Sequence, residues 1–249
     1  MSKELAKKES DALAEWNSMQ RRNSNKTNFI KLVNTPLGEN GKENPEYGKI
    51  FATHYTPEGE EIREELPKDA EFFLVKTRVQ IRCADYDDSI GKPRYWCREV
   101  NEFDPISVMD VDGKEVAFGA YKELKEEYDL KFTNAAYVYY NGNLYRWIIG
   151  GAHFQTWFDV KGKIDKGQRP YTFKVSHLTD EKVGSNHFKA IHFELGNPYP
   201  VEDAVLIARE LDASLASYYE KVAEADKAAK EVPLEVEAPA EENPVDLPF

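Results

Sequence analysis

The segment Phe72–Cys83 constrains the fold more than any other, because its side chains alternate between two chemical types. Alternate residues of a β-strand point to opposite faces of a sheet. The pattern therefore predicts a long strand with one buried and one exposed, cationic face. The odd positions, which we expect to be buried, are Phe73, Val75, Thr77, Val79, Ile81 and Cys83. The even positions of the exposed face are Phe72, Leu74, Lys76, Arg78, Gln80 and Arg82.

A second strand with the same arrangement is expected after the polar turn 85–93. Tyr95 and Cys97 lie on one of its faces, and Arg94, Trp96, Arg98 and Val100 lie on the other. If the two strands pair, both cysteines fall in the core, where a free thiol acts as a small apolar side chain. The exposed side then carries Arg78, Arg82, Arg94, Trp96 and Arg98.

The clearest hairpin signal lies in residues 135–149, around Asn141-Gly142-Asn143. Asn-Gly is typical of the tight turns that join antiparallel strands. Alternation on either side of this turn predicts two faces. One face carries Tyr137, Tyr139, Leu144, Arg146 and Ile148, and the other carries Val138, Tyr140, Tyr145 and Trp147.

The remaining pattern predicts further strands and several helices. We expect helices over 3–22, 120–130, 153–160 and 201–229, strands over 29–33, 170–177 and 187–195, and a hairpin over 106–118 around Asp112-Gly113. Residues 35–67 read as an irregular insertion with a short strand near 49–51. The fold class is therefore α+β, mainly antiparallel β. The expected divisions are a helical arm (1–25), a β-rich core (26–200), a C-terminal helix (201–230) and a tail (231–249).

The tail differs in composition from everything before it. It contains six acidic residues and four prolines but no lysine or arginine. So little apolar surface cannot offset the entropy of ordering a chain, which predicts disorder. Its last residues are nevertheless apolar and aromatic, and a terminal Phe249 with its carboxylate suits capture in a partner's pocket. The tail is thus expected to be a docking peptide, the alternative being an ordinary frayed terminus.

The sequence Asp246-Leu247-Pro248-Phe249 resembles the C-terminal tip of bacterial single-stranded-DNA-binding proteins, usually Asp-Ile-Pro-Phe after a run of aspartates. Some phage single-stranded-DNA-binding proteins likewise end in an acidic tail closed by an aromatic residue. Here the acids are dispersed glutamates, Leu replaces Ile, and the body aligns with no part of the compact bacterial domain. The resemblance implies that the four residues bind replication, recombination or repair proteins. It also implies an oligonucleotide-binding (OB) barrel, here enlarged and flanked by N- and C-terminal helices.

The net charge of −12 weakens the case for nucleic-acid binding without excluding it. Six of the 45 acidic residues lie in the tail, and all 33 lysines and arginines lie before it. The body therefore carries 39 acidic and 33 basic residues, a net charge of −6. Affinity for nucleic acid depends on a local basic path rather than on the total charge.

The exposed strand faces offer the chemistry that binds single-stranded DNA without sequence preference. Aromatic rings stack on bases, and adjacent cations neutralise phosphates. The alternative is that the arginines are merely solvated and the tyrosines pack in the core. The candidate DNA-binding residues are Phe72, Lys76, Arg78, Arg82, Arg94, Trp96, Arg98, Tyr137, Tyr139 and Arg146.

Enzyme signatures are weak. The chain contains no phosphate-binding loop, no Gly-x-Ser-x-Gly and no His-Glu-x-x-His. The best alternative is a magnesium-dependent nuclease using Asp112 and Lys114, with Asp104 and Asp110 as further ligands. A hairpin turn accounts for Asp112-Gly113 equally well. A third alternative is an adaptor that recruits partners by its tail without touching DNA. Our expectation is a protein without catalysis, cofactor or metal.

The compartment and partners follow from simple features. No apolar run approaches the ~20 residues of a membrane span, and residues 1–8 lack the apolar segment of a signal peptide. Two cysteines cannot form a disulfide framework, which favours a reducing compartment. We expect a cytoplasmic protein of a bacterium or its phage that binds single-stranded DNA and proteins but no membrane, with a homo-oligomer as an option.

Overall fold

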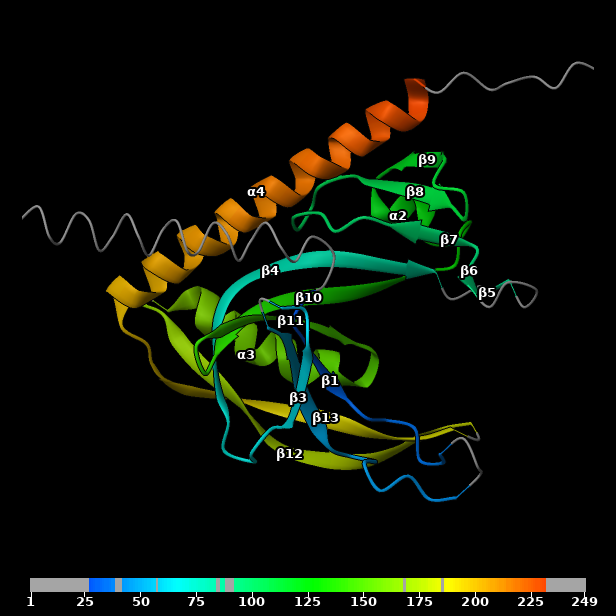
Figure 1. Ribbon diagram of the computed structural model, residues 1–249. Helices are drawn as coiled ribbons and strands as arrows, with labels where there is room; N and C mark the ends of the chain where they lie inside the picture. Colours follow the sequence, from blue (N-terminus) through cyan, green and yellow to red (C-terminus); the bar gives the residue numbers. More distant parts are fainter. Residues whose placement is uncertain are drawn as a thin grey trace, which may run out of the picture. The chain divides into compact units, whose positions relative to one another are not determined.

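The computed structural model describes residues 27–38, 42–56, 58–83, 86–87, 92–167, 169–184 and 186–231 (Figure 1). The chain divides into two units, Met1–Ala208 and Arg209–Phe249. Every described strand belongs to the first unit. The second unit contains the greater part of the last helix, α4 (Val201–Glu231).

Most of the first unit is a single sheet. Its main path runs in the order β3-β2-β1-β11-β10-β4-β7-β8-β9, and β12 joins it by pairing with β4. The neighbours are antiparallel except for β1 and β11, which are parallel. The strands of this path are β1 (Phe29–Leu32), β2 (Ile50–Tyr55), β3 (Glu61–Glu65), β4 (Glu71–Cys83), β7 (Tyr95–Cys97), β8 (Ile106–Asp110), β9 (Glu115–Gly119), β10 (Leu130–Tyr140) and β11 (Asn143–Gly150).

Shorter or later elements complete the unit. The long hairpin of β12 and β13 is attached at the N-terminal part of β4, where Phe73 pairs with Thr172. A separate ribbon of two short strands, β5 and β6, precedes β7. The bounds are β5 (Tyr86–Asp87), β6 (Lys92–Pro93), β12 (Tyr171–Val183), β13 (Asn186–Pro198), α2 (Tyr121–Leu124), the 3-10 helix η1 (Gly151–His153) and α3 (Phe154–Lys166).

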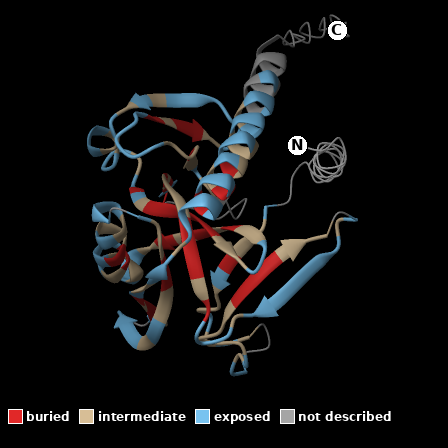
Figure 2. Cartoon of the chain, turned by 90° about the vertical axis from the view of Figure 1, so that its left-hand side faces the viewer, coloured by how far each residue is buried: buried red, intermediate tan, exposed pale blue. Residues whose placement is uncertain are grey.

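The main core lies between one face of the sheet, helix α3 and the β12–β13 hairpin. Trp157 of α3 is fully buried, and its indole N–H donates a 3.1 Å hydrogen bond to the buried Asn134 of β10. Its ring meets those of Phe173 and Phe193 edge to face. Figure 2 shows the buried residues concentrated along the strands in the middle of the molecule. Aromatic packing of this kind fits a sheet face that is mostly apolar under α3, with Asn134 as a buried polar exception bonded to Trp157.

A second core cluster joins the other half of β4 to β7, β8 and α2. It contains Val79, Ile81, Cys83, Cys97 and Val108, all nearly inaccessible to solvent. Both cysteines are free thiols in this cluster. The prediction that they lie on the core side is confirmed. Burial, and secondarily the neighbouring Cys83, raises the pKa of Cys97 to about 12, because a thiolate loses its hydration there.

The two predicted hairpins are confirmed. Asn141 and Gly142 both have positive φ, 46° and 83°, which is the backbone of a type I′ turn joining β10 to β11. The opposing pairs Tyr137–Arg146 and Tyr139–Leu144 show that the expected faces are correct. Gly113 has φ 80° in the turn between β8 and β9.

Residues 35–67 contain more regular structure than the sequence predicts. Both β2 and β3 lie in this segment, and β3 is exposed along its whole length. The charged sequence of β3, Glu61-Ile62-Arg63-Glu64-Glu65, has no buried face that could reveal it as a strand. It forms because an edge strand needs only the backbone hydrogen bonds of its neighbour.

The helices differ from expectation in length. The helix expected over 120–130 is the single turn α2, and β10 begins already at Leu130. Helices α3 and α4 are confirmed and run to Lys166 and Glu231. The helix expected over 3–22 lies outside the described residues.

The fold class α+β, mainly antiparallel β, is confirmed. The sheet is open, since β3 and β9 occupy the two ends of its path and are not paired with each other. A closed barrel is therefore not what the described strands form. Among the described residues, no helix is both long and apolar enough to cross a membrane.

Candidate nucleic-acid interface

A β-bulge in β4 decides which of its side chains share a face. Lys76 lies opposite Tyr137 of β10, and Leu74 lies opposite Val138, so that Val75 is the extra residue between them. One extra residue shifts the alternation of side chains by one position. From Lys76 to Arg82 the even positions keep the solvent side that the sequence predicts. Before the bulge the even positions turn toward the core.

The register brings the two predicted groups of residues to one side of the sheet. Lys76 lies opposite Tyr137, which lies opposite Arg146 of β11. Arg82 is flanked by Trp96 of β7 on one side and Lys131 of β10 on the other. Directly opposite residues of neighbouring strands point to the same side. We call this side the basic face and define it by Lys76, Arg78, Arg82, Trp96, Arg98, Lys131, Tyr137 and Arg146.

The bulge corrects the prediction for Phe72. The sequence places this residue on the exposed cationic face, but its ring is 1% exposed and packs against Tyr140, Trp147 and Phe173 in the main core. Phe73, predicted to be buried in the core under the sheet, lies on the opposite side. Its ring stacks on Tyr199 at 4.3 Å between centroids.

Tyr139 is also less available than the sequence suggests. It packs with Phe73 against Ala204 and Ile207 of the first turns of α4. These turns cover one end of the basic face. Tyr139 therefore belongs to a hydrophobic cluster rather than to a surface on which bases can stack.

Glu99 holds the centre of the basic face together. Its side chain is only 9% exposed, and one carboxylate oxygen pairs with the guanidinium of Arg146. The other oxygen accepts a 2.6 Å hydrogen bond from the hydroxyl of Tyr137. Arg146 also donates to the side-chain oxygen of Gln80 at 2.9 Å. Tyr137 and Arg146 are thus fixed in place by an internal anion, which the sequence did not indicate.

Arg78 is anchored to the loop that follows β7. Its two terminal nitrogens donate to the side chain of Asn101 at 3.2 Å and to the carbonyl of Glu99 at 3.1 Å. Asn101 in turn donates to Asp104 at 2.8 Å. The guanidinium therefore has a structural role, although it lies on the predicted face.

The remaining cations lie toward β7. Arg82 and Arg94 are exposed, and Lys76 and Arg98 are half-buried. The Arg98 guanidinium lies 5.9 Å from the ring centroid of Trp96, within range of a cation–π contact. Trp96 is half-buried because its indole N–H donates a 2.7 Å hydrogen bond to the carbonyl of Asp110. Part of this ring remains accessible beside cations, as base stacking requires.

Lys131 is a member of the basic face that the sequence analysis missed. It is exposed and forms a 2.6 Å ion pair with Asp129. The hydrogen bond to Asp129 raises the pKa of Lys131. Lys131 could have been predicted only from the register of β10 against β4, in which it lies opposite Arg82. The alternation of side chains along a single strand does not give that register.

The same side of the sheet has a pocket at its other end, over β1, β2 and β3. The pocket has a volume of about 280 Å³. Phe29 of β1 lies opposite Arg146, so this pocket adjoins the basic face. The main lining residues are Phe29, Lys31, Phe51, Thr53, Glu61 and Arg63. None of them was a predicted site residue.

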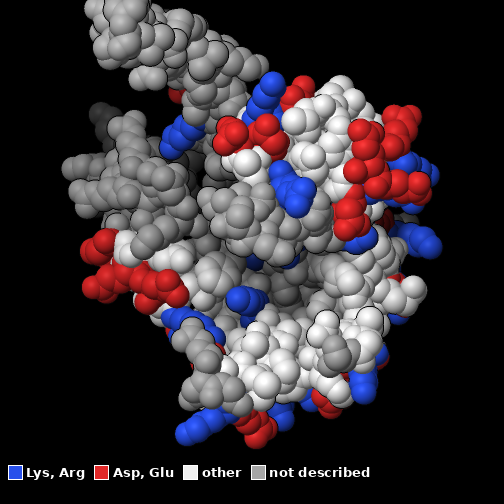
Figure 3. All heavy atoms as spheres, turned by 90° about the vertical axis from the view of Figure 1, so that its right-hand side faces the viewer, with Lys and Arg blue, Asp and Glu red and all other residues white. Residues whose placement is uncertain are grey.

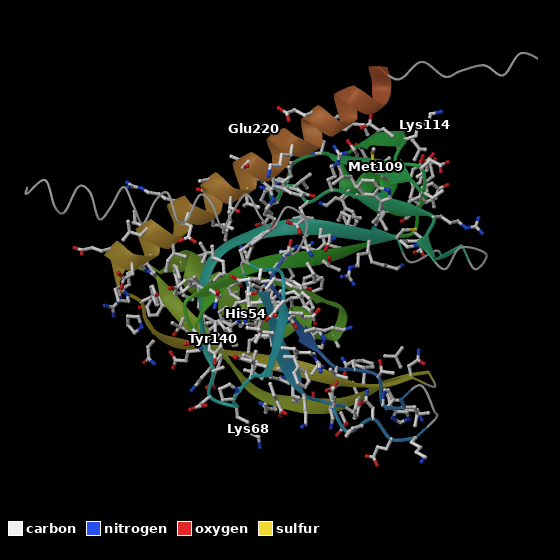
Figure 4. The ribbon with its side chains drawn as sticks, viewed as in Figure 1. His54, Lys68, Met109, Lys114, Tyr140 and Glu220 are labelled. Carbon is white, nitrogen blue, oxygen red and sulfur yellow. The ribbon has the colours of Figure 1, made fainter. Side chains whose placement is uncertain are left out.

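Three residues of the nuclease alternative, Asp110, Asp112 and Lys114, build a turn, whereas Asp104 accepts a hydrogen bond from Asn101. A side-chain oxygen of Asp110 accepts hydrogen bonds from the backbone N–H groups of Asp112 and Lys114, at 3.0 and 2.9 Å. Lys114 lies exposed at the outer end of this hairpin (Figure 4). Within the described part of the chain, no group of three or more His, Cys, Asp or Glu side chains could hold a metal ion.

The charge on the surface is locally uneven. On the side drawn in Figure 3, lysine and arginine side chains lie around a hollow, and acidic side chains gather in clusters further out. The total charge is therefore a poor guide to any single face. The predicted partner-binding residues Asp246, Leu247, Pro248 and Phe249 lie outside the described residues.

Comparison with known proteins provides no relative from which a function could be transferred. No protein family model, no curated protein and no solved structure matches the chain.

Proposed function

We propose that this chain is a non-catalytic single-stranded-DNA-binding protein. Its basic face holds the strand by phosphate contacts and ring stacking, and its tail recruits proteins of replication, recombination or repair through Asp246–Phe249. The tail part of the proposal depends on the resemblance of its last residues to the tip of bacterial single-stranded-DNA-binding proteins.

One observation carries the DNA-binding part. Two groups of residues that the sequence could only treat separately lie on one side of one sheet, joined by the opposing pairs Lys76–Tyr137 and Tyr137–Arg146. Tyr137 itself is buried, so the ring that supports the proposal is that of Trp96 beside the cations, as a non-specific single-strand binder requires. The resemblance implies an OB-type barrel, but the proposal requires only the face of an open sheet.

Arg82 and Arg94 are the most direct phosphate-binding candidates, because both side chains are exposed. Trp96 and Arg98 lie beside them and offer the stacking surface. Arg78 donates to the carbonyl of Glu99 and Arg146 to the side chain of Gln80, so the contribution of these two arginines depends on the contacts around Glu99.

The first test is fluorescence anisotropy of a labelled oligo-dT with the full chain and with a version that ends at Lys230. Titrations at about 50 and about 200 mM salt give the salt dependence of binding. We expect both forms to bind, with affinity falling as salt rises. Binding retained by the truncated form places DNA affinity in the body and leaves recruitment to the tail.

A pair of matched variants tests whether DNA binds at two exposed cations, Arg82 of the basic face and Arg94 just before β7. The double variant Arg82→Ala/Arg94→Ala should lower the slope of log affinity against log salt by about 0.7 for each lost phosphate contact. The control is Lys163→Ala/Lys166→Ala, which removes two exposed lysines from the last turn of α3, on the core side of the sheet. Equal losses in both variants would place the DNA elsewhere. If neither the full chain nor the version ending at Lys230 binds oligo-dT, the adaptor alternative is favoured.

A further inference from the structure

The pocket over β1, β2 and β3 adjoins the basic face, because its lining residue Phe29 lies opposite Arg146. A single row of directly opposite residues runs across six strands, from β4 to β3. Neighbouring strands are about 4.8 Å apart, so Phe29 lies one such spacing from Arg146. The row consists of Lys76, Tyr137, Arg146, Phe29, Thr53 and Arg63. A DNA strand whose phosphate is bound at Arg146 would therefore pass the mouth of the pocket.

The lining of the pocket suits a neutral planar ring better than an anion. Phe29 supplies apolar surface, Phe51 is buried beneath Arg63, and the cations Lys31 and Arg63 are balanced by Glu46 and Glu61. Two carboxylates would repel a phosphate, but a ring with donors and acceptors on its edge can bond to groups of both signs. The volume of about 280 Å³ lies near the lower end for ligand pockets, about 300 Å³, which fits one base.

The walls of the pocket are held in place before any ligand arrives. Arg63 donates to both oxygens of Glu46, at 2.7 and 2.8 Å, and its guanidinium lies 3.6 Å over the ring centroid of Phe51. Asn34 is fixed by two hydrogen bonds to the backbone of Lys189, at 2.7 and 2.9 Å. Preorganised walls lower the entropy lost on binding.

We infer that this pocket receives one nucleobase of the bound strand, while the adjoining phosphate lies on Arg146 and Lys76. The inference rests on the proposed DNA binding and adds a site for a base. The base stacks on Phe29, and its edge faces the polar groups of Lys31, Glu61 and Arg63.

The test compares oligo-dT with an abasic oligonucleotide of the same length, which keeps the phosphates and lacks the bases. Phe29→Ala should weaken the binding of oligo-dT about tenfold, the effect of losing about 1.4 kcal/mol of stacking, and leave the abasic strand unaffected. The control is Phe118→Ala, which removes an exposed ring from β9, at the opposite end of the sheet. That control should bind both strands like the unmodified protein.

The outcomes separate the two proposals. If the unmodified protein binds oligo-dT and Phe29→Ala binds it equally well, the pocket inference is overturned and the proposed function stands. An equal loss on both strands would also overturn it, since the base would not matter. If the unmodified protein binds neither strand, both proposals fail.

A measurement on the unmodified protein does not depend on the folding of any variant. Oligo-dT substituted with 5-iododeoxyuridine is irradiated in the complex, and the cross-linked peptides are identified by mass spectrometry. Cross-links on Phe29 or Phe51 support the base pocket. Cross-links confined to Trp96 and Tyr137 would place the bases on the basic face alone and overturn the inference.

Discussion

The hydroxyl of Tyr137 donates a 2.6 Å hydrogen bond to the carboxylate of Glu99, whose other oxygen pairs with Arg146. A buried acid thus lies at the centre of a face whose other charged groups are mostly cations. It orders the ring and the guanidinium, and it also neutralises one positive charge that a phosphate could use. Under the proposed function, Glu99 should therefore stabilise the fold and weaken the binding of DNA.

Glu99→Gln should separate these two effects. The neutral amide keeps the size of the side chain but leaves Arg146 without its counter-ion. We expect a loss of stability of about 1–3 kcal/mol, since the pair is largely buried, measured by urea denaturation. Affinity for oligo-dT should rise, with a salt slope steeper by about 0.7. A variant with unchanged salt dependence would show that Arg146 does not reach the DNA.

Trp96→Ala/Arg98→Ala should weaken DNA binding and leave partner docking intact. Removing one stacking ring and its neighbouring cation is expected to cost about 1–3 kcal/mol of binding energy, measured by anisotropy with oligo-dT. Because Trp96 also bonds to Asp110, circular dichroism should first establish that the variant is folded. A folded variant with the original affinity would contradict the placement of the site.

Deletion of Phe249 should give the converse result. Docking of a replication or repair protein should be lost in a pull-down, because the ring is the apolar anchor of the proposed tip. Oligo-dT affinity should stay equal or rise slightly, since the acidic tail is expected to compete with DNA for the same cations and has lost its apolar end. Loss of DNA binding on this deletion would contradict the separation of roles.

Cys97 should be unreactive in the folded protein. Burial raises the pKa of its thiol to about 12, and only the thiolate reacts with disulfide reagents. We expect negligible labelling of the two cysteines by Ellman's reagent at pH 8, and complete labelling in urea. The raised pKa also means that stability falls as pH rises from about 9 toward 12, because the unfolded thiol ionises first. Cys97→Ala should reduce that alkaline loss.

Glu71 should contribute stability that disappears in acid. It accepts 2.7 Å hydrogen bonds from Thr172 and from the Asn197 side chain, and these bonds lower the pKa of its carboxyl below 4.5. A lowered pKa stabilises the fold above the ordinary value, and the effect is lost as pH falls through the folded value. Glu71→Gln should therefore lower the melting temperature at pH 7 and lower it less in acid, once the carboxyl of Glu71 is protonated in the folded protein. An equal effect at pH 7 and in acid would exclude a role for the charge.

The sequence predicts well wherever a local pattern decides the structure. The Asn141-Gly142 turn defines its hairpin because both residues tolerate positive φ. Cys83 and Cys97 lie in the core because alternation places them on the apolar side of their strands. Arg82 and Trp96 share a face for the same reason, and the structure shows them as direct neighbours.

Other features depend on contacts between distant segments. The extra residue Val75 reverses the faces of Phe72 and Phe73, yet nothing in the apolar run marks a bulge there. Strand β3 has no buried face, and β1 pairs in parallel with β11, a partner more than a hundred residues away in sequence. Backbone hydrogen bonds create these pairings, and every residue except proline can make them.

The sequence by itself thus determined the β-rich class, the main hairpins, the buried cysteines and the cationic alternation of residues 76–82. Only the tertiary structure decided that the sheet stays open, that Glu99 reaches Arg146, and that Phe29 joins the basic face to a pocket. The physical reason is that the alternation of side chains indicates which side of a strand is buried. It does not indicate which other strand will be its neighbour, because that pairing depends on the packing of the whole sheet.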